Sequence, residues 1–189
     1  MKRIDTVLSG VCILEPVVHG DPRGYFMETY SRCKMEELGI DIEFVQDNES
    51  RSRGGVVRGL HYQLGQPQAK LVRVTEGEVF DVAVDVRLGS PTFGRSVGVL
   101  LSGENKRALL VPEGFAHGFC VVSETAQFVY KCSDYYAPAE ERGVLWSDPA
   151  LGIDWPLAGE PLLSEKDQAY KLLAECPAED LPVYQEPAS

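Results

Sequence analysis

The chain has 189 residues, of which 44% are hydrophobic and 25% are charged, a composition typical of a folded globular protein rather than a disordered or fibrous one. Eighteen basic against twenty-nine acidic side chains give a net charge of -11, which disfavours a nucleic-acid-binding surface. An anionic ligand would therefore need a local cluster of arginine and lysine to overcome the long-range repulsion.

The five cysteines are widely spaced and never form a C-x-x-C pair, which disfavours a disulfide framework or a zinc site. The first twenty residues mix acidic and basic side chains and contain only short apolar runs, so they do not predict a signal peptide, a transmembrane helix or a lipid anchor. We therefore expect a cytoplasmic protein without a membrane partner, folded as a single domain over residues 1–189.

The N-terminal segment, residues 1–50, predicts a strand around GYFMETY and then a short helix. Ser31 is suited to cap the start of this helix and Gly39 to stop it.

From Val56 to Tyr130 the chain is a succession of short β-branched and aromatic runs separated by turn signals such as LGQPQ, EGE and SGEN. This spacing is typical of an all-β sandwich or barrel, whose core we place at about residues 51–147. In DVAVDV the residue types alternate with the period of a strand, so we expect one face of this strand to be exposed to solvent or to line a cavity. Residues 148–189 predict a loop, a second helix from Ser164 to about Glu175, and an irregular proline-rich tail.

Two of the three histidines, His61 and His117, fall on predicted core strands, whereas His19 lies in a turn-like surface stretch. A buried histidine is often only a hydrogen-bonded core residue. However, PEGFAHGF contains P-x-G-x-x-H, which resembles the second motif of cupin barrels, where the histidine projects into the barrel lumen. The first cupin motif would supply H-x-H, but here it reads HYQ, so we do not predict a metal site.

The stretch RGLHYQLGQPQAKLVRV places Arg58, His61 and Lys70 on strands that should line the core. A neutral imidazole can remove a moderately acidic proton, and a nearby ammonium can stabilise the oxyanion that forms. This pattern favours proton abstraction beside a carbonyl. Tyr130 could return the proton from the opposite face, although a core aromatic on a strand is the alternative.

A histidine that acts as a base also needs an orienting carboxylate, and Asp167 is one candidate. Ser164-x-x-Asp167 also fits a helix capping box, which would explain Asp167 without any catalytic role.

A series of ordered motifs resembles one family: DPRGYFMETY, FVQDN, VVRGLHYQ, QAKLVRV, DVAVDVR, SPTFG, PEGFAHGF, YKCSDYY and LSEKD. Together they run from about Arg3 to Lys171 and are similar to the dTDP-4-dehydrorhamnose 3,5-epimerases. The resemblance implies a mainly β, cupin-like jelly-roll barrel with a few short flanking helices. It also implies inversion at C3 and C5 of dTDP-4-dehydro-6-deoxy-D-glucose, on the way to dTDP-L-rhamnose.

The resemblance implies a role for each matching position. His61 would be the base, held by Asp167, Tyr130 the acid, and Lys70 the group that binds the C4 oxygen. Contacts to the nucleotide, the diphosphate and the sugar would come from Arg23, Phe26, Glu28, Gln46, Asp47, Asn48, Arg58, His117, Tyr136, Glu141 and Lys166.

The resemblance further implies a homodimer in which the N-terminal strand crosses to the partner subunit, and a reaction without a cofactor. Three alternatives stay open: an epimerase that inverts only C3 or only C5, a metal-dependent cupin enzyme, and a non-catalytic sugar-binding cupin.

Arg58 and His61 are three residues apart, so strict strand alternation would point them to opposite faces. For both to reach one substrate the strand must twist or bulge, and we expect this at Gly59.

Overall fold

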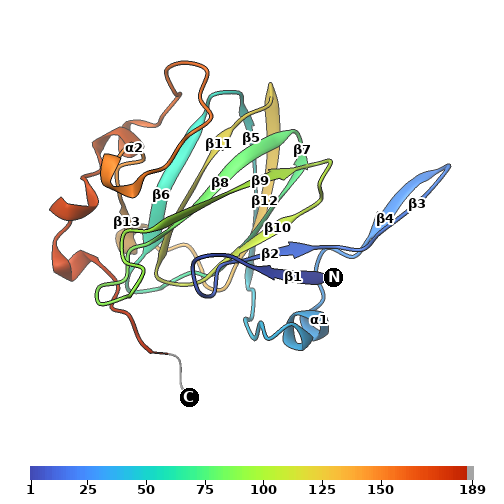
Figure 1. Ribbon diagram of the computed structural model, residues 1–189, viewed down its shortest axis with the longest axis horizontal. Helices are drawn as coiled ribbons and strands as arrows, with labels where there is room; N and C mark the ends of the chain where they lie inside the picture. The colour runs from blue at the N-terminus through green and yellow to red at the C-terminus, as the bar shows by residue number, and fades with distance from the viewer. Residues whose placement is uncertain (187–189) are drawn as a thin grey trace.

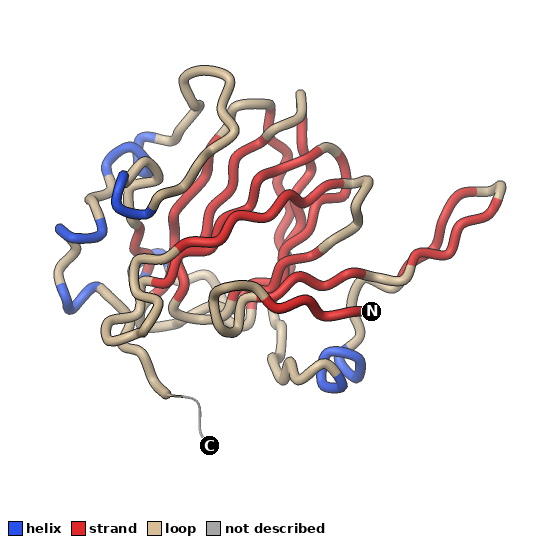
Figure 2. The backbone as a smooth tube through the Cα atoms, in the orientation of Figure 1, coloured by secondary structure: helices blue, strands red, loops and turns tan. Residues whose placement is uncertain are grey.

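The computed structural model describes residues 1–186, which fold mainly into antiparallel β-sheet. Strands form the body of the molecule, and the helices are short and lie at its periphery (Figure 2). The strands and α-helices are β1 (Lys2–Asp5), β2 (Cys12–Glu15), β3 (Val18–Asp21), β4 (Gly24–Met27), α1 (Arg32–Glu37), β5 (Gln46–Arg53), β6 (Val57–Gln63), β7 (Lys70–Glu76), β8 (Glu78–Asp85), β9 (Ser96–Ser102), β10 (Ala108–Val111), β11 (Phe115–Val121), β12 (Thr125–Cys132), β13 (Glu141–Gly143) and α2 (Glu165–Ala169).

Two sheets build the barrel (Figure 1). One has the strand order β1-β2-β10-β7-β12-β5, and the other has the order β13-β6-β11-β8-β9. Neighbouring strands in both sheets are antiparallel, and the non-consecutive order is that of a jelly roll. The predicted cupin-like, mainly β fold is confirmed.

The apolar core fills only part of the barrel interior. Alternate residues of a strand point to the same face, so Val74, Val72 and Lys70 follow one another along the inner face of β7. Likewise, Phe128 of β12 belongs to the core and Tyr130 packs at its edge. The interior therefore changes from apolar to polar part-way along both strands.

The C-terminal region covers the outer face of the β13-β6-β11-β8-β9 sheet, where a second cluster of apolar side chains is buried. On β8, Val82 and Val84 belong to this cluster, and Asp81 and Asp85 on the other face are fully buried as well. The expectation of a wet or cavity-lining face for DVAVDV is therefore wrong, because both faces of β8 are covered.

Helix α1 ends where it was predicted to end, since Gly39 adopts a left-handed conformation with φ of 73°. Ser31 occupies the N-cap position, but its side chain makes no capping hydrogen bond, so this part of the prediction is wrong. Its carbonyl accepts the Met35 N–H instead.

Helix α2 is shorter than predicted, ending at Ala169 rather than near Glu175. Beyond it the Leu145 N–H donates to the carbonyl of Lys171, and the Leu173 N–H donates to the Asp148 carboxylate. These tertiary hydrogen bonds replace the helical ones, and only a 3₁₀ turn at Leu173–Glu175 follows.

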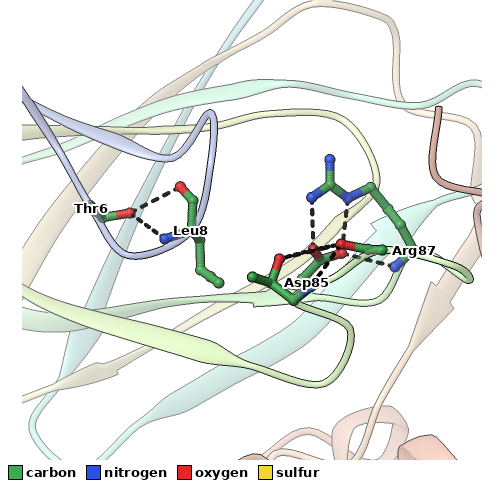
Figure 3. Close-up of polar contacts among 6 residues, drawn as sticks. Thr6, Leu8, Asp85 and Arg87 are labelled. Carbon is green, nitrogen blue, oxygen red and sulfur yellow. Dashed lines mark hydrogen bonds and ion pairs between the residues drawn. The ribbon is translucent and has the colours of Figure 1, made fainter. Parts of the chain in front are cut away.

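Two groups of polar contacts, one buried around Asp85 and one partly buried around Thr6, hold turns in place (Figure 3). The Asp85 carboxylate accepts hydrogen bonds from the Arg87 guanidinium at 2.7 and 2.8 Å and from the hydroxyls of Ser90 and Thr92. Although burial opposes its charge, these donors lower the pKa of Asp85. In the β1–β2 turn the Thr6 hydroxyl donates to the carbonyl of Leu8.

The β3–β4 hairpin projects from the body on the side away from α2 (Figure 1). It contains the strand predicted around GYFMETY. The last three residues of the predicted irregular tail, 187–189, lie outside the described residues. Within residues 1–186 no helix has the length and apolar character that crossing a bilayer requires.

Candidate active site

His61 and Asp167 form a hydrogen-bonded pair, although 106 residues separate them in the chain. His61 lies on β6 and Asp167 on α2, with 2.5 Å between Nε2 and Oδ1. Burial alone would raise the pKa of Asp167, but the hydrogen bond and charge of His61 outweigh it and hold that pKa below its ordinary value. Nδ1 of His61 has no hydrogen-bond partner among the described residues.

The capping interaction predicted at Ser164 coexists with this pair. The Ser164 hydroxyl accepts the backbone N–H of Asp167 at 3.1 Å, while the carboxylate of Asp167 bonds His61. The two readings of Asp167 therefore do not compete, because they use different atoms.

Lys70 and Tyr130 lie on adjacent strands of the other sheet and line the same cavity as His61. Lys70 is the first residue of β7, and burial lowers the pKa of its ammonium. Among the described residues its ammonium has no carboxylate within ion-pair distance. Burial raises the pKa of the Tyr130 phenol, so it keeps its proton at neutral pH.

The cavity has two lobes that share His61, Lys70 and Tyr130. The first lobe, of about 390 Å³, is also lined by Arg58, His117, Phe128, Ser164, Lys166 and Asp167. The second, of about 370 Å³, is also lined by Gln46, Asn48, Gln63, Gln68, Tyr136 and Glu141. The imidazole of His61, the ammonium of Lys70 and the phenol of Tyr130 therefore lie where the two lobes meet.

The irregularity predicted at Gly59 is present. The pairing of β6 with β11 shifts register between His117 and Phe119, opposite Gly59, whose φ is 124°. A Cβ at Gly59 would lie 2.5 Å from Cα of Gly118, so only glycine fits there. Because of this shift Arg58 and His61 line the same cavity, as predicted.

His117 faces the cavity from β11 as half of a second histidine–carboxylate pair. Its Nε2 lies 2.9 and 3.1 Å from the two carboxylate oxygens of Asp81, a fully buried residue on the adjacent strand β8. His117 and His61 are directly opposite each other in the β6–β11 pairing. Two histidines, each held by an aspartate, therefore share one cavity wall.

Glu141 gathers three hydrogen bonds at the rim of the second lobe. Its carboxylate accepts from Lys166, from the Tyr136 hydroxyl at 2.9 Å and from the Tyr170 hydroxyl at 3.1 Å. Burial works against its charge, but Lys166 and Tyr136 lower the pKa of Glu141 overall. The rim is thus charged and hydrogen-bonded, with Lys166 half exposed.

Four predicted site residues do not line this cavity within the chain. Arg23, Phe26 and Glu28 belong to or follow the projecting hairpin, where Arg23 pairs with Asp21 and Glu28 with Lys34. Asp47 points to the outer face of β5, because its neighbours Gln46 and Asn48 point inward, and its carboxylate bonds Lys131. The side chain of Asp47 therefore gives no support to its predicted substrate contact.

Sequence reasoning missed Asp81, Ser52 and Tyr170. Ser52 accepts two hydrogen bonds from the Arg58 guanidinium, both at 3.2 Å. The signal for Asp81 was an aspartate inside an apolar strand pattern, which demands a buried partner. The described residues contain no group of three or more His, Cys, Asp or Glu side chains that could hold a metal ion.

Comparison with known proteins decides the family. The family model for dTDP-4-dehydrorhamnose 3,5-epimerase matches residues 5–175. This chain belongs to the dTDP-4-dehydrorhamnose 3,5-epimerase family. An epimerase of that name from Pseudomonas aeruginosa is 57% identical over 176 residues, which cover 93% of this chain and 97% of the relative.

A solved structure agrees with this assignment. A dTDP-6-deoxy-D-glucose-3,5-epimerase from Legionella pneumophila, in complex with dTDP-4-keto-L-rhamnose, aligns with a TM-score of 0.95 and 57% identity, covering 97% of this chain and 98% of that chain.

A further sequence relative is named for a single centre. A dTDP-4-dehydrorhamnose 3-epimerase from Streptomyces niveus is 45% identical over 170 residues, which cover 89% of this chain and 82% of the relative. The family thus includes epimerases named for two centres and for one.

Proposed function

We propose that this protein inverts C3 and C5 of dTDP-4-dehydro-6-deoxy-D-glucose to give dTDP-4-dehydro-L-rhamnose. The observation that carries the proposal is the meeting of the His61–Asp167 pair, Lys70 and Tyr130 at the junction of the two cavity lobes. Both C3 and C5 are adjacent to the C4 ketone, so one oxyanion site can serve both inversions.

His61 acts as the base in this mechanism. Asp167 holds Nε2, so Nδ1 is left to accept the proton from the carbon next to the ketone. The electron pair moves into the enolate, and its charge develops on the C4 oxygen. The Lys70 ammonium stabilises that oxygen, and it does so strongly because the site is buried and Lys70 has no competing ion pair among residues 1–186.

Tyr130 acts as the acid and returns a proton to the carbon from the opposite face of the ring. Its phenol keeps its proton because burial raises its pKa. The ketone itself makes the neighbouring hydrogens acidic enough for removal, so the proposed reaction uses no cofactor.

The remaining cavity residues bind the substrate. Arg58 and Lys166 bring positive charge to a protein whose net charge is -11, and this suits a diphosphate. We assign sugar and nucleotide contacts to five other polar residues that line the two lobes: Gln46, Asn48, His117, Tyr136 and Glu141.

We further propose a homodimer in which the β3–β4 hairpin completes the partner's site. The hairpin leaves Tyr25 58% and Phe26 72% exposed, which a monomer would not favour, and Arg23, in the turn between β3 and β4, does not line the cavity of its own chain. Mixing His61→Ala chains with Arg23→Ala chains tests this. At substrate concentrations well below the KM of the Arg23→Ala protein, activity should rise after subunit exchange, because one mixed site then has both wild-type residues, and no rise would contradict sharing.

The test of the activity is incubation with dTDP-4-dehydro-6-deoxy-D-glucose in D₂O, followed by NMR at C3 and C5. Deuterium at both carbons supports the double epimerase. Deuterium at one carbon selects the second candidate, a single-centre epimerase, which the Streptomyces niveus relative favours. Deuterium at neither would leave a sugar-binding protein, and an elemental assay on the same sample tests a metal-dependent enzyme. His61→Ala protein is the matched negative control.

A further inference from the structure

Tyr170 lies between the base and the charged rim of the cavity. It directly follows α2, and its ring meets the His61 imidazole edge-on, with 5.6 Å between the ring centroids and 63° between the planes. Its hydroxyl donates to Glu141 at 3.1 Å. Helix α2 and the residue that follows it therefore contact His61 twice, through Asp167 at Nε2 and through Tyr170 against the ring.

Gly143 makes room for this ring. In the β13–β6 pairing Gly143 is directly opposite His61. A Cβ at Gly143 would lie 2.4 Å from Cζ of Tyr170, well inside contact distance. The phenol ring therefore occupies the space that a side chain at position 143 would fill, and this space adjoins the base.

The Tyr170 hydroxyl has a fixed partner, unlike that of Tyr130. Burial and the adjacent Glu141 raise the pKa of Tyr170, so it stays a neutral donor to that carboxylate. Tyr130 makes no side-chain hydrogen bond to another of residues 1–186 and lines both lobes of the cavity. This contrast separates a phenol that can give its proton to substrate from one that holds a neighbour in place.

We propose that Tyr170 is a positioning residue for His61. The Tyr170 ring fills the space that the absent side chain of Gly143 leaves open, and from there it fixes the orientation of the His61 imidazole. The inference rests on the proposed epimerase function. Asp167 restrains one atom of the imidazole but leaves the ring free to swing about that bond, and the edge of Tyr170 removes this freedom. A base displaced by about 1 Å can lose roughly 10²-fold in rate, so the restraint acts on the chemical step.

Three variants test the proposal kinetically. Tyr170→Leu keeps an apolar side chain but removes the aromatic edge, and we expect kcat to fall about 10- to 100-fold with KM within about threefold. Tyr170→Phe keeps the ring and should retain kcat within about threefold. Gly143→Ala keeps Tyr170 but displaces its ring, and should lower kcat like Tyr170→Leu. Tyr184→Ala, which removes a tyrosine that packs on Arg87, is the control and should leave kcat unchanged.

A second readout does not depend on turnover. The chain has only three histidines, so their imidazole nitrogens can be followed individually by ¹⁵N NMR. The His61 ring should give one set of sharp signals in wild type and Tyr170→Phe, and shifted or exchange-broadened signals in Tyr170→Leu and Gly143→Ala, because Asp167 still fixes the tautomer and only the ring orientation is released. The proposal would be overturned if Tyr170→Leu and Gly143→Ala both kept the wild-type kcat and the wild-type His61 signals. Equal kcat losses in Tyr170→Phe and Tyr170→Leu would also overturn it. Absence of turnover in wild type would instead refute the proposed function, while the NMR comparison would still decide the role of Tyr170.

Discussion

The two histidine–aspartate pairs of the cavity differ in how the fold supplies the carboxylate. His117 and Asp81 sit on neighbouring strands of one sheet, and their side chains are 8% and 0% exposed. His61 takes its carboxylate from α2, outside the barrel, and its own side chain is 25% exposed to the cavity. A histidine held by a carboxylate is thus not by itself a base. We infer that access of the imidazole to substrate separates the catalytic pair from the one that shapes the cavity wall.

Replacing the two histidines should separate the pairs most clearly. His61→Ala removes the proposed base and should lower kcat by at least about 10³-fold, whereas His117→Ala leaves His61 in place and should mainly raise KM. Arg23→Ala, at the exposed hairpin, should likewise raise KM with little change in kcat. Steady-state kinetics on the three variants measures this, and similar kcat losses from His61→Ala and either of the others would contradict the assignment.

The oxyanion site should give the next largest effect. Lys70→Met keeps the apolar stem but removes the charge, and we expect kcat to fall roughly 10²- to 10³-fold. His61 and Asp167 are untouched, so exchange of the C3 and C5 hydrogens with D₂O should slow by the same factor. Exchange at the wild-type rate in Lys70→Met would mean that Lys70 does not stabilise the enolate.

Removing the aspartate of each pair should affect stability and activity in opposite orders: the Asp81 variant should lose more stability, and the Asp167 variant should lose more activity. Asp81→Ala leaves a buried histidine without its partner and should cost about 1–3 kcal/mol of unfolding free energy, measured in urea. Asp167→Ala leaves a more exposed histidine, so its stability loss should be smaller and its kcat loss larger. If both variants lose kcat equally, the His117 pair takes part in the chemistry.

The pH dependence of stability should show the smallest difference. The folded-state pKa values of Asp167 and Asp85 are lowered, so each carboxylate stabilises the fold fully above the pKa of an unfolded aspartate, about 3.9. That contribution is lost as the pH falls below this value and through the folded-state pKa. Urea midpoints from pH 6 to pH 3 should therefore fall less steeply in Asp167→Asn and Asp85→Asn than in wild type. Unchanged slopes would show that neither carboxylate is ionised preferentially in the folded state.

Local patterns predicted some of the residues that line the cavity, and the family resemblance supplied others, such as Gln46, Tyr136 and Glu141. Lys70 and Tyr130 line the cavity as predicted from their places on strands, and His117 does so as predicted from the cupin-like motif, because both signals are local properties of the chain. The bulge at Gly59 followed from one argument, that two residues three apart could not otherwise face one substrate. Asp47 shows the limit of this reasoning. Gln46, Asp47 and Asn48 were assigned together as substrate contacts, but alternate residues of a strand point to opposite faces, so Asp47 points away from the cavity and bonds Lys131.

The roles of α2 and β8 could not be derived in the same way. Asp81 meets His117 only because β8 lies beside β11, which no local pattern predicts. Tyr170 reaches His61 because α2 stops at Ala169 and the chain then bonds to the loop around Leu145. The predicted continuation of α2 to Glu175 followed local helix propensity, and tertiary hydrogen bonds overrode it.

By itself the sequence determined the antiparallel β class, the polar side chains that interrupt the apolar strands, and the family. Only the tertiary structure decided which of these side chains meet. His61 and Asp167 come from segments 106 residues apart, and the order of the strands with the packing of α2 brings them to 2.5 Å. The physical reason is that strand periodicity depends on residues that are neighbours in the sequence. The partner of a buried polar group depends instead on contacts between distant parts of the chain.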